Sequence, residues 1–179
     1  MSSLVVLSGL PGVGKTTIAR AVGAETGAVH LRIDTIEAAL STSGIVERAG
    51  GWESNPDAGY RVAYAVAGDL LRAGHDVVAD SVNPLGITRT AWAAVADAAH
   101  ANLIDVEVTC VDRALHRRRV EERVSDLEGL TVPTWAEVVQ RRYEPRALSV
   151  LRVDTSAGIE TAVGTLVAAI RASVEDTGV

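Results

Sequence analysis

The stretch LSGLPGVGKTTIAR, at Leu7–Arg20, decides the fold because it matches the spacing G-x-x-x-x-G-K-[ST] at Gly9, Gly14, Lys15 and Thr16. Glycines let consecutive backbone N–H groups point inward and form an anion nest, and a helix that starts there adds its positive end. Lys15 is the only lysine of a chain whose other strongly basic side chains are all arginines. A compact ammonium on a flexible stem can bridge two phosphate groups where a wider guanidinium would not fit. The stretch is therefore predicted to bind a nucleotide's phosphates.

The bulk composition is that of one soluble globular domain spanning residues 1–179. A net charge of −6 argues against a general nucleic-acid binder, although it leaves room for a local basic pocket. Cys110 is the only cysteine, so neither an internal disulfide nor a cysteine zinc site can form. No signal-like start and no apolar run of about 18 residues occurs, which excludes a membrane span and makes the cytoplasm the expected location.

Apolar runs alternate with helical patterns, which indicates βαβ units and an α/β fold: a doubly wound, five-stranded parallel sheet with helices on both faces. Residues 42–56 are rich in Gly, Ser, Asn and Pro and are predicted to form a loop. The predicted strands cover 3–8, 28–33, 76–80, 103–111 and 148–154, and the predicted helices cover about 15–26, a start at 35, 58–73, 87–101, 134–147 and 158–174.

Ligands of such sheets bind at the carboxyl ends of the strands, and polar residues stand at each predicted end. Beyond the glycine loop these are Asp34, Asp80, Asp112 and Asp154. Each aspartate also suits a helix N-cap, and Asp34 with Glu37 matches a capping box. Capping and ligand binding are compatible, because a capping carboxylate can still face a pocket.

The chain resembles the small P-loop kinases, the group with gluconate, shikimate and adenylylsulfate kinases, and within it the branch of polynucleotide kinase and chloramphenicol phosphotransferase. The resemblance covers nearly the whole chain. It rests on GLPGVGKTT at 9–17, RID at 32–34, VVADSVNPLGITRTAW at 77–92, RVEER at 119–123, PTWAEVVQRRYE at 133–144 and VDTSAG at 153–158. It implies a P-loop NTPase fold that binds ATP and Mg²⁺ and has an Arg-rich helical lid.

The resemblance implies a catalytic role for Lys15, Asp34, Arg119 and Arg123. A carboxylate is also the chemically suitable group to accept the proton of an attacking alcohol, which supports Asp34 as general base or orienter. Asp80 ends an apolar strand like the aspartate of a Walker B strand, so it and Thr16 are the expected Mg²⁺ ligands. The alternative for Asp80 is strand-end capping.

Half of the arginines fall between Arg113 and Arg146, and residues 113–132 are the predicted lid segment. Arg119 and Arg123 are four apart and share a helix face, from which they could stabilise charge on the transferred phosphoryl group. The alternatives are a solvated charged helix, a register in which Arg118 takes the place of Arg119, and contact with RNA or DNA. Nearby acidic residues reduce the positive charge of the segment, which disfavours contact with RNA or DNA.

The remaining expected binding residues surround the nucleotide and the acceptor. Trp52, on the 42–56 substrate loop, is expected to cover the acceptor or simply to pin the loop, and Arg89 to hold substrate or to solvate its helix. The four histidines lack ligand spacing and are interpreted as structural or exposed. The expected nucleotide-binding residues are Gly9, Pro11, Gly12, Val13, Gly14, Lys15, Thr16, Thr17, Arg119, Thr155, Ser156 and Gly158, and the expected acceptor-binding residues are Asp34, Trp52, Asp80, Asn83 and Arg89.

The expected function is ATP-dependent transfer of the γ-phosphate to a hydroxyl of a small molecule. Two alternatives stay open: a nucleotide-binding switch with a protein partner, since the same loop serves both classes, and a 5′-hydroxyl polynucleotide kinase, which the acidic charge disfavours.

Overall fold

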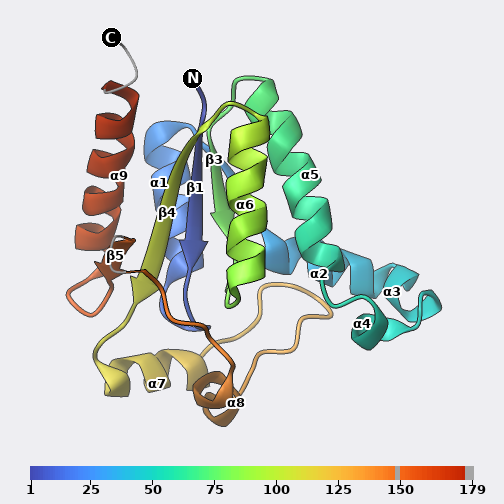
Figure 1. Cartoon of the computed structure of the whole chain (residues 1–179). Coiled ribbons are helices and arrows are strands. Elements are labelled where there is room, and N and C mark those ends of the chain that lie inside the picture. Colours follow the sequence, from blue (N-terminus) through green and yellow to red (C-terminus); the bar gives the residue numbers. More distant parts are fainter. Residues whose placement is uncertain (148–149, 176–179) are drawn as a thin grey trace.

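A single parallel sheet organises the chain in the computed structural model, which describes residues 1–147 and 150–175 (Figure 1). Within those residues its strands are β1 (Ser3–Ser8), β2 (Val29–Arg32), β3 (Val77–Asp80), β4 (Asn102–Thr109) and β5 (Leu151–Asp154). Their order is β2-β3-β1-β4-β5, and every neighbouring pair is parallel. The predicted α/β architecture and the doubly wound, five-stranded sheet are confirmed.

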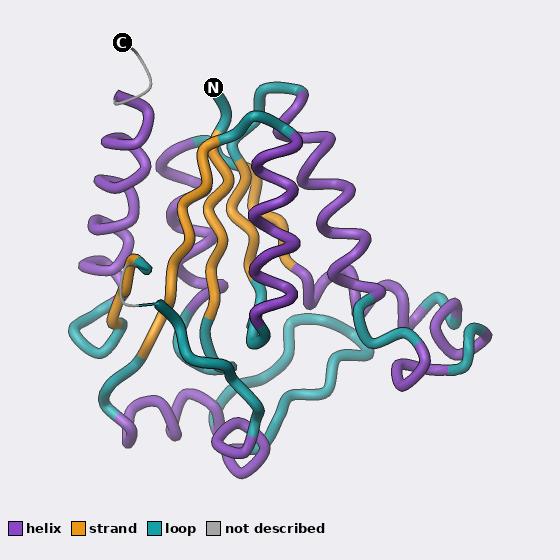
Figure 2. The backbone as a smooth tube through the Cα atoms, in the orientation of Figure 1, coloured by secondary structure: helices purple, strands orange, loops and turns teal. Residues whose placement is uncertain are grey.

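Helices cover both faces of the sheet (Figure 2). α1 and α9 pack on one face, while α5 and α6 pack on the other. No helix of the described chain is long and apolar enough to span a bilayer. The described helices are α1 (Lys15–Thr26), α2 (Ile33–Thr42), α3 (Ile45–Arg48), α4 (Gly51–Ser54), α5 (Ala58–Arg72), α6 (Gly86–Ala98), α7 (Arg113–Glu121), α8 (Trp135–Gln140) and α9 (Ile159–Glu175).

The core lies in two layers because successive strand residues point to opposite faces. In β1, Val5 and Leu7 join the cluster under α1 and α9, while Leu4 and Val6 join the cluster under α5 and α6. Trp92 of α6 is fully buried in the second layer, edge-on to a tyrosine ring of α5. Strands that are buried on both faces explain the uninterrupted apolar runs of the sequence.

The strand order creates the place where the candidate site forms. β1 lies between β3 and β4, so the chain leaves its carboxyl end at the point where strand order reverses. Leu7 of β1 pairs with Asp80 of β3, and Asp80 also pairs with Arg32 of β2. The ends of three strands and the glycine loop therefore meet at one edge of the sheet.

Several predicted boundaries were wrong. The helix predicted over 134–147 ends at Gln140, because Arg141 takes an extended conformation and Glu144 folds back to accept a hydrogen bond from the Gly86 N–H at 2.7 Å. The 42–56 loop contains the short helices α3 and α4, each entered through a glycine with positive φ. The start of the strand predicted at 148–154 lies outside the described residues, since 148 and 149 are not described. The lid segment is helical only through Glu121.

Candidate nucleotide-binding and acceptor site

The glycine loop between β1 and α1 is held tightly against the sheet. The Gly9 N–H donates to the Val82 carbonyl at 3.1 Å, and a Cβ added at Gly9 would lie 2.3 Å from the Val108 carbonyl oxygen. Gly12 has φ +84°, and a Cβ there would lie 2.5 Å from Val120. Only glycine fits these two positions without moving the neighbouring backbone or helix α7.

Lys15 begins α1 and is 8% exposed. Its ammonium donates to the carbonyl oxygens of Gly9 and Leu10 at 2.9 and 3.0 Å, inside the curl of the loop. Burial lowers the pKa of Lys15 to about 8, although the carboxylates of Asp80 and Asp34 oppose that shift. The lone lysine is thus a buried cation that gains from the arrival of an anionic ligand.

Asp80 stands at the end of β3 and is 3% exposed. Burial raises its pKa, but the His30 hydrogen bond, the Lys15 charge and the Thr16 hydroxyl outweigh burial and leave the pKa below its ordinary value. An ionised carboxylate beside a threonine hydroxyl offers the hard oxygen atoms that Mg²⁺ prefers, so the two residues present fit that ion. Among the described residues no group of three or more His, Cys, Asp or Glu could hold a metal by itself.

His30 is a site residue that the sequence interpretation missed. Its Nε2 lies 3.1 Å from the Asp80 carboxylate and donates to it. The contact exists because β2 pairs with β3, although 50 residues separate the two side chains. A histidine in a short apolar strand gives no sign of that partner in the sequence.

Asp34 lies in the first turn of α2, whose N-cap is Arg32 and has no side-chain capping bond. The capping box predicted for Asp34 and Glu37 is therefore wrong: the helix begins at Ile33, two residues earlier than the motif requires. Asp34 instead faces two guanidinium groups, Arg123 at 3.4 Å and Arg32 at 3.6 Å. One of these, Arg123, belongs to the lid segment.

The other expected lid arginine points to the opposite end of the site. Arg119 donates to the Thr155 hydroxyl at 2.8 Å and to the Thr155 carbonyl at 3.3 Å. The Thr155 hydroxyl donates in turn to the Val13 carbonyl of the glycine loop at 2.8 Å. Arg118 is exposed, so the structure directs Arg119 inward in this register. Asp112 caps α7 through the Ala114 and Leu115 N–H groups.

The residues after β5 form a tight turn beside Arg119. Asp154 accepts hydrogen bonds from the Val111 N–H at 3.0 Å and from Ser156, and Gly158 turns the chain into α9 with φ +118°. Bonding to these donors outweighs burial and lowers the pKa of Asp154. Its place is thus at a turn that brings Thr155 and Ser156 to the glycine loop.

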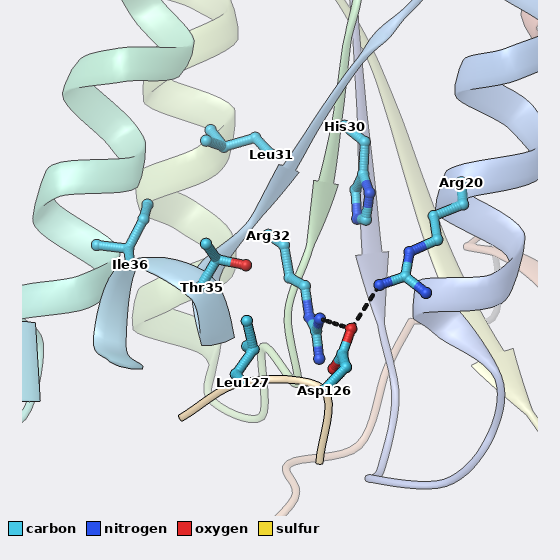
Figure 3. Close-up of a pocket in the computed structure, with 8 residues that line it drawn as sticks. All are labelled: Arg20, His30, Leu31, Arg32, Thr35, Ile36, Asp126 and Leu127. Atoms are coloured by element: carbon cyan, nitrogen blue, oxygen red, sulfur yellow. Dashed lines mark hydrogen bonds and ion pairs between the residues drawn. The ribbon is translucent and has the colours of Figure 1, made fainter. Parts of the chain in front are cut away.

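Beyond α7 the lid segment brings Asp126 and Leu127 next to Arg32 and Arg20 (Figure 3). Asp126 accepts from Arg20 of α1 at 2.7 Å and from Arg32 of β2 at 2.9 Å, and it borders a cavity of about 320 Å³ with residues of β2 and α2. Hydrogen bonds from Arg32 and Arg20 hold the pKa of Asp126 well below its usual range. This attachment, which the sequence did not suggest, ties the lid segment to α1 and β2.

Three expected acceptor residues have other partners in this structure. The Trp52 indole N–H donates to the Ser41 hydroxyl at 3.1 Å, which pins the substrate loop to α2. Asn83 is fully buried with φ 47°, and its side-chain amide donates to Ser8 at 3.0 Å. Arg89 donates to four backbone carbonyls, those of Asn83, Pro84, Glu144 and Pro145, at 2.8–3.2 Å.

The site therefore has two sides around Lys15. The phosphate side combines the glycine loop, Thr16, Asp80 and the Arg119–Thr155 pair. The other side combines Asp34, Arg123 and the start of α2. Lys15 and Arg119 supply positive charge on the first side, where it can neutralise a polyphosphate. Asp34 supplies a carboxylate on the second side, where it can bind a proton donor.

Comparison with known proteins shows which family this architecture belongs to. No curated protein matches the sequence. Similar solved structures include a gluconokinase from Sinorhizobium meliloti (18% identity, TM-score 0.65, covering 98% of this chain and 94% of that one) and the APS kinase CysC of Mycobacterium tuberculosis in complex with AMPPNP and APS (20%, 0.62, 95% and 98%). Kti12 of Chaetomium thermophilum in complex with ADP-AlF3 is another (24%, 0.61, 91% and 96%). The family model described as AAA domain matches residues 4–154, which is most of the chain. With its glycine loop, buried lysine and five-stranded parallel sheet, the chain belongs to the AAA domain family of P-loop proteins.

Proposed function

We propose that this protein is a kinase that transfers the γ-phosphoryl group of ATP to a hydroxyl of a small molecule. The observation that carries the proposal is the position of Asp34. It lies near enough to Lys15 to influence the lysine's pKa, yet it belongs to α2, outside the glycine loop. A carboxylate so placed can receive the proton of a hydroxyl that approaches the end of a bound triphosphate.

The glycine loop and Lys15 would hold the β- and γ-phosphates, with the Lys15 ammonium leaving its two carbonyl partners for phosphate oxygens. Thr16 and Asp80 would hold Mg²⁺, which when bound supplies further positive charge. Arg119, Thr155, Ser156 and Gly158 would border the nucleoside.

Asp34 accepts the acceptor's proton while the acceptor oxygen bonds to the γ-phosphorus and the bond from that phosphorus to the β,γ-bridging oxygen breaks. Arg123, which faces Asp34 at 3.4 Å, then lies where it can stabilise negative charge on the moving phosphoryl group. The lid segment excludes water, so the phosphoryl group reaches the acceptor rather than a water molecule.

Two of the similar structures support the kinase class as fold relatives: a gluconokinase and an APS kinase bound to AMPPNP and APS. A third, Kti12, is in complex with ADP-AlF3, which supports nucleotide binding. Their different names leave the acceptor open. Hydroxyl-bearing metabolites are proposed because the guanidinium groups on the Asp34 side of the site are ion-paired with that carboxylate and do not form a broad basic surface.

The test measures ADP release from ATP and Mg²⁺ with a panel of sugars, polyols, nucleosides and 5′-hydroxyl oligonucleotides. Acceptor-dependent ADP release is expected, and Lys15→Ala should abolish it. Asp34→Asn should keep ATP binding and lower kcat by about 100-fold or more. Asp69→Asn, at an exposed carboxylate of α5, is the matched control and should leave kcat unchanged. ADP release that ignores every acceptor would instead favour a nucleotide switch.

A further inference from the structure

A second carboxyl lies on the acceptor side of the site. Glu37 is three residues after Asp34 on α2, so both side chains share one helix face. Glu37 packs over Gly59 of α5, where an added Cβ would lie 2.4 Å from Glu37 Cγ and 2.9 Å from its Oε1. Gly59 is buried, so the helix leaves room here for an acid side chain.

The Glu37 carboxyl has no hydrogen bond or ion pair with any residue in the described part of the chain, although it is half-buried. Asp34 on its own helix and Arg141 after α8 both act on its charge, and the same two groups act on Lys15. The charges of Glu37 and Asp34 also contribute to a raised pKa of Tyr60 on α5. Glu37 therefore belongs to the space around Lys15 and Asp34 rather than to the outer surface.

The protonation of this carboxyl reflects that position. Burial, and to a lesser extent the Asp34 charge, raise the pKa of Glu37 to about 7 against the opposing charge of Arg141. A partly buried carboxyl without a protein partner keeps its hydrogen-bonding capacity for water or for a ligand that displaces that water.

The lid segment encloses this part of α2. Arg123 contacts Asp34, and Gly129 passes so close that a Cβ there would lie 3.0 Å from Thr42 and 4.0 Å from the Ala38 carbonyl. Asp126 holds the same stretch to Arg32. An acceptor that reaches Asp34 under this cover also lies beside Glu37.

We propose that Glu37 binds a second hydroxyl of the acceptor, and that the acceptor is an uncharged polyhydroxy compound with one hydroxyl at Asp34 and a neighbouring one at Glu37. The inference rests on the proposed kinase function. A hydroxyl both donates and accepts, so it can bond a carboxyl in either protonation state. The Arg32 and Arg123 guanidinium groups are already paired with Asp34, and Glu37 adds a carboxyl beside them, so this position matches a second hydroxyl better than a phosphate, which disfavours phosphorylated compounds and the 5′ ends of nucleic acids.

The experiment compares neutral polyols and sugars with their singly phosphorylated analogues and with a 5′-hydroxyl oligonucleotide, using ADP release by the full chain. The neutral acceptor should have the higher kcat/KM. Glu37→Gln should raise the acceptor's KM by about tenfold and narrow the preference for neutral over anionic acceptors, with the KM for ATP unchanged. The matched control is Glu25→Gln, at an exposed glutamate in the last turn of α1, which should change neither constant.

The outcomes separate the two proposals. An anionic best acceptor, or an unchanged acceptor KM in a folded Glu37→Gln protein, would overturn the role of Glu37 and leave the kinase proposal standing. Absence of acceptor-dependent ADP release from every compound would overturn the kinase proposal, and the role of Glu37 with it.

Discussion

Replacing Arg89 by methionine should destabilise the folded chain substantially. The guanidinium of Arg89 ties two distant segments together, because it donates to carbonyls that follow β3 and to carbonyls of residues 144 and 145. It also lies 5.1 Å from the centre of the Tyr143 ring. Methionine keeps much of the aliphatic length but offers no donor, so all of the guanidinium's bonds are lost.

The expected loss follows from the four bonds. If each contributes about 1 kcal/mol net from a charged, half-buried donor, the free energy of unfolding falls by roughly 3–5 kcal/mol. A domain of this size has about 5–15 kcal/mol in total, so the variant should still fold but should melt about 10 °C lower. Urea unfolding, followed by fluorescence with buried Trp92 as a reporter and by circular dichroism, measures the change.

The control is Arg142→Met in the same segment. Arg142 is 80% exposed and pairs with Glu144 at 2.8 Å, so its loss should change stability by less than about 0.5 kcal/mol. If Arg89→Met kept its stability and instead weakened acceptor binding, Arg89 would be a substrate residue and the structural role deduced for it would be refuted.

Three more outcomes are expected. Burial lowers the pKa of Lys15 to about 8 in the folded chain, below its unfolded value of about 10.4, so the free energy of unfolding should rise from pH 8 to 10. ATP binding at pH 8.5 should take up protons, which calorimetry in two buffers detects. Release of protons would contradict this. Gly9→Ala should abolish nucleotide binding and destabilise the chain by several kcal/mol, whereas Gly27→Ala, with φ +79° but open space around it, should cost only about 1 kcal/mol in a melting experiment; equal effects would contradict the contact with β4. Asp126→Asn should expose residues 122–134 to faster trypsin cleavage at neutral pH than Glu121→Gln, and identical cleavage rates would contradict the attachment. Because guanidinium partners depress the pKa of Asp126, wild type should lose this protection progressively as pH falls below about 4, which cleavage by an acid protease measures.

The nucleotide side of the site could be predicted from local sequence. The glycine loop, Lys15 and Thr16 are adjacent in the chain, and the apolar runs before and after them predict a strand and a helix in the right order. Asp80 could be predicted because it ends such a run. The sheet follows from the same alternation of apolar strands and amphipathic helices.

The acceptor side depends on contacts that sequence spacing does not encode. Asp34 matches a capping box, yet tertiary packing starts α2 at Ile33 and leaves the carboxylate for Arg123. His30 acquires a partner 50 residues away because β2 pairs with β3, and Asp126 acquires one 94 residues away because the segment after α7 returns to β2. The helix predicted at 134–147 fails because Glu144 gains more from the Gly86 N–H than from another helical turn.

Helix α7 is joined to the glycine loop, and this determines how the lid segment can move. His116 is buried, donates to the Pro11 carbonyl at 2.8 Å and stands edge-on to Trp135. With its start fixed to the loop in this way, α7 cannot swing as a rigid arm. The pivot of any opening falls after Glu121. The stretch beyond it is held to α1, β2 and α2 largely by ion pairs, and the Arg20–Asp126 pair among them is exposed. Such pairs weaken with ionic strength, so salt concentration should set how often the acceptor's entrance is open.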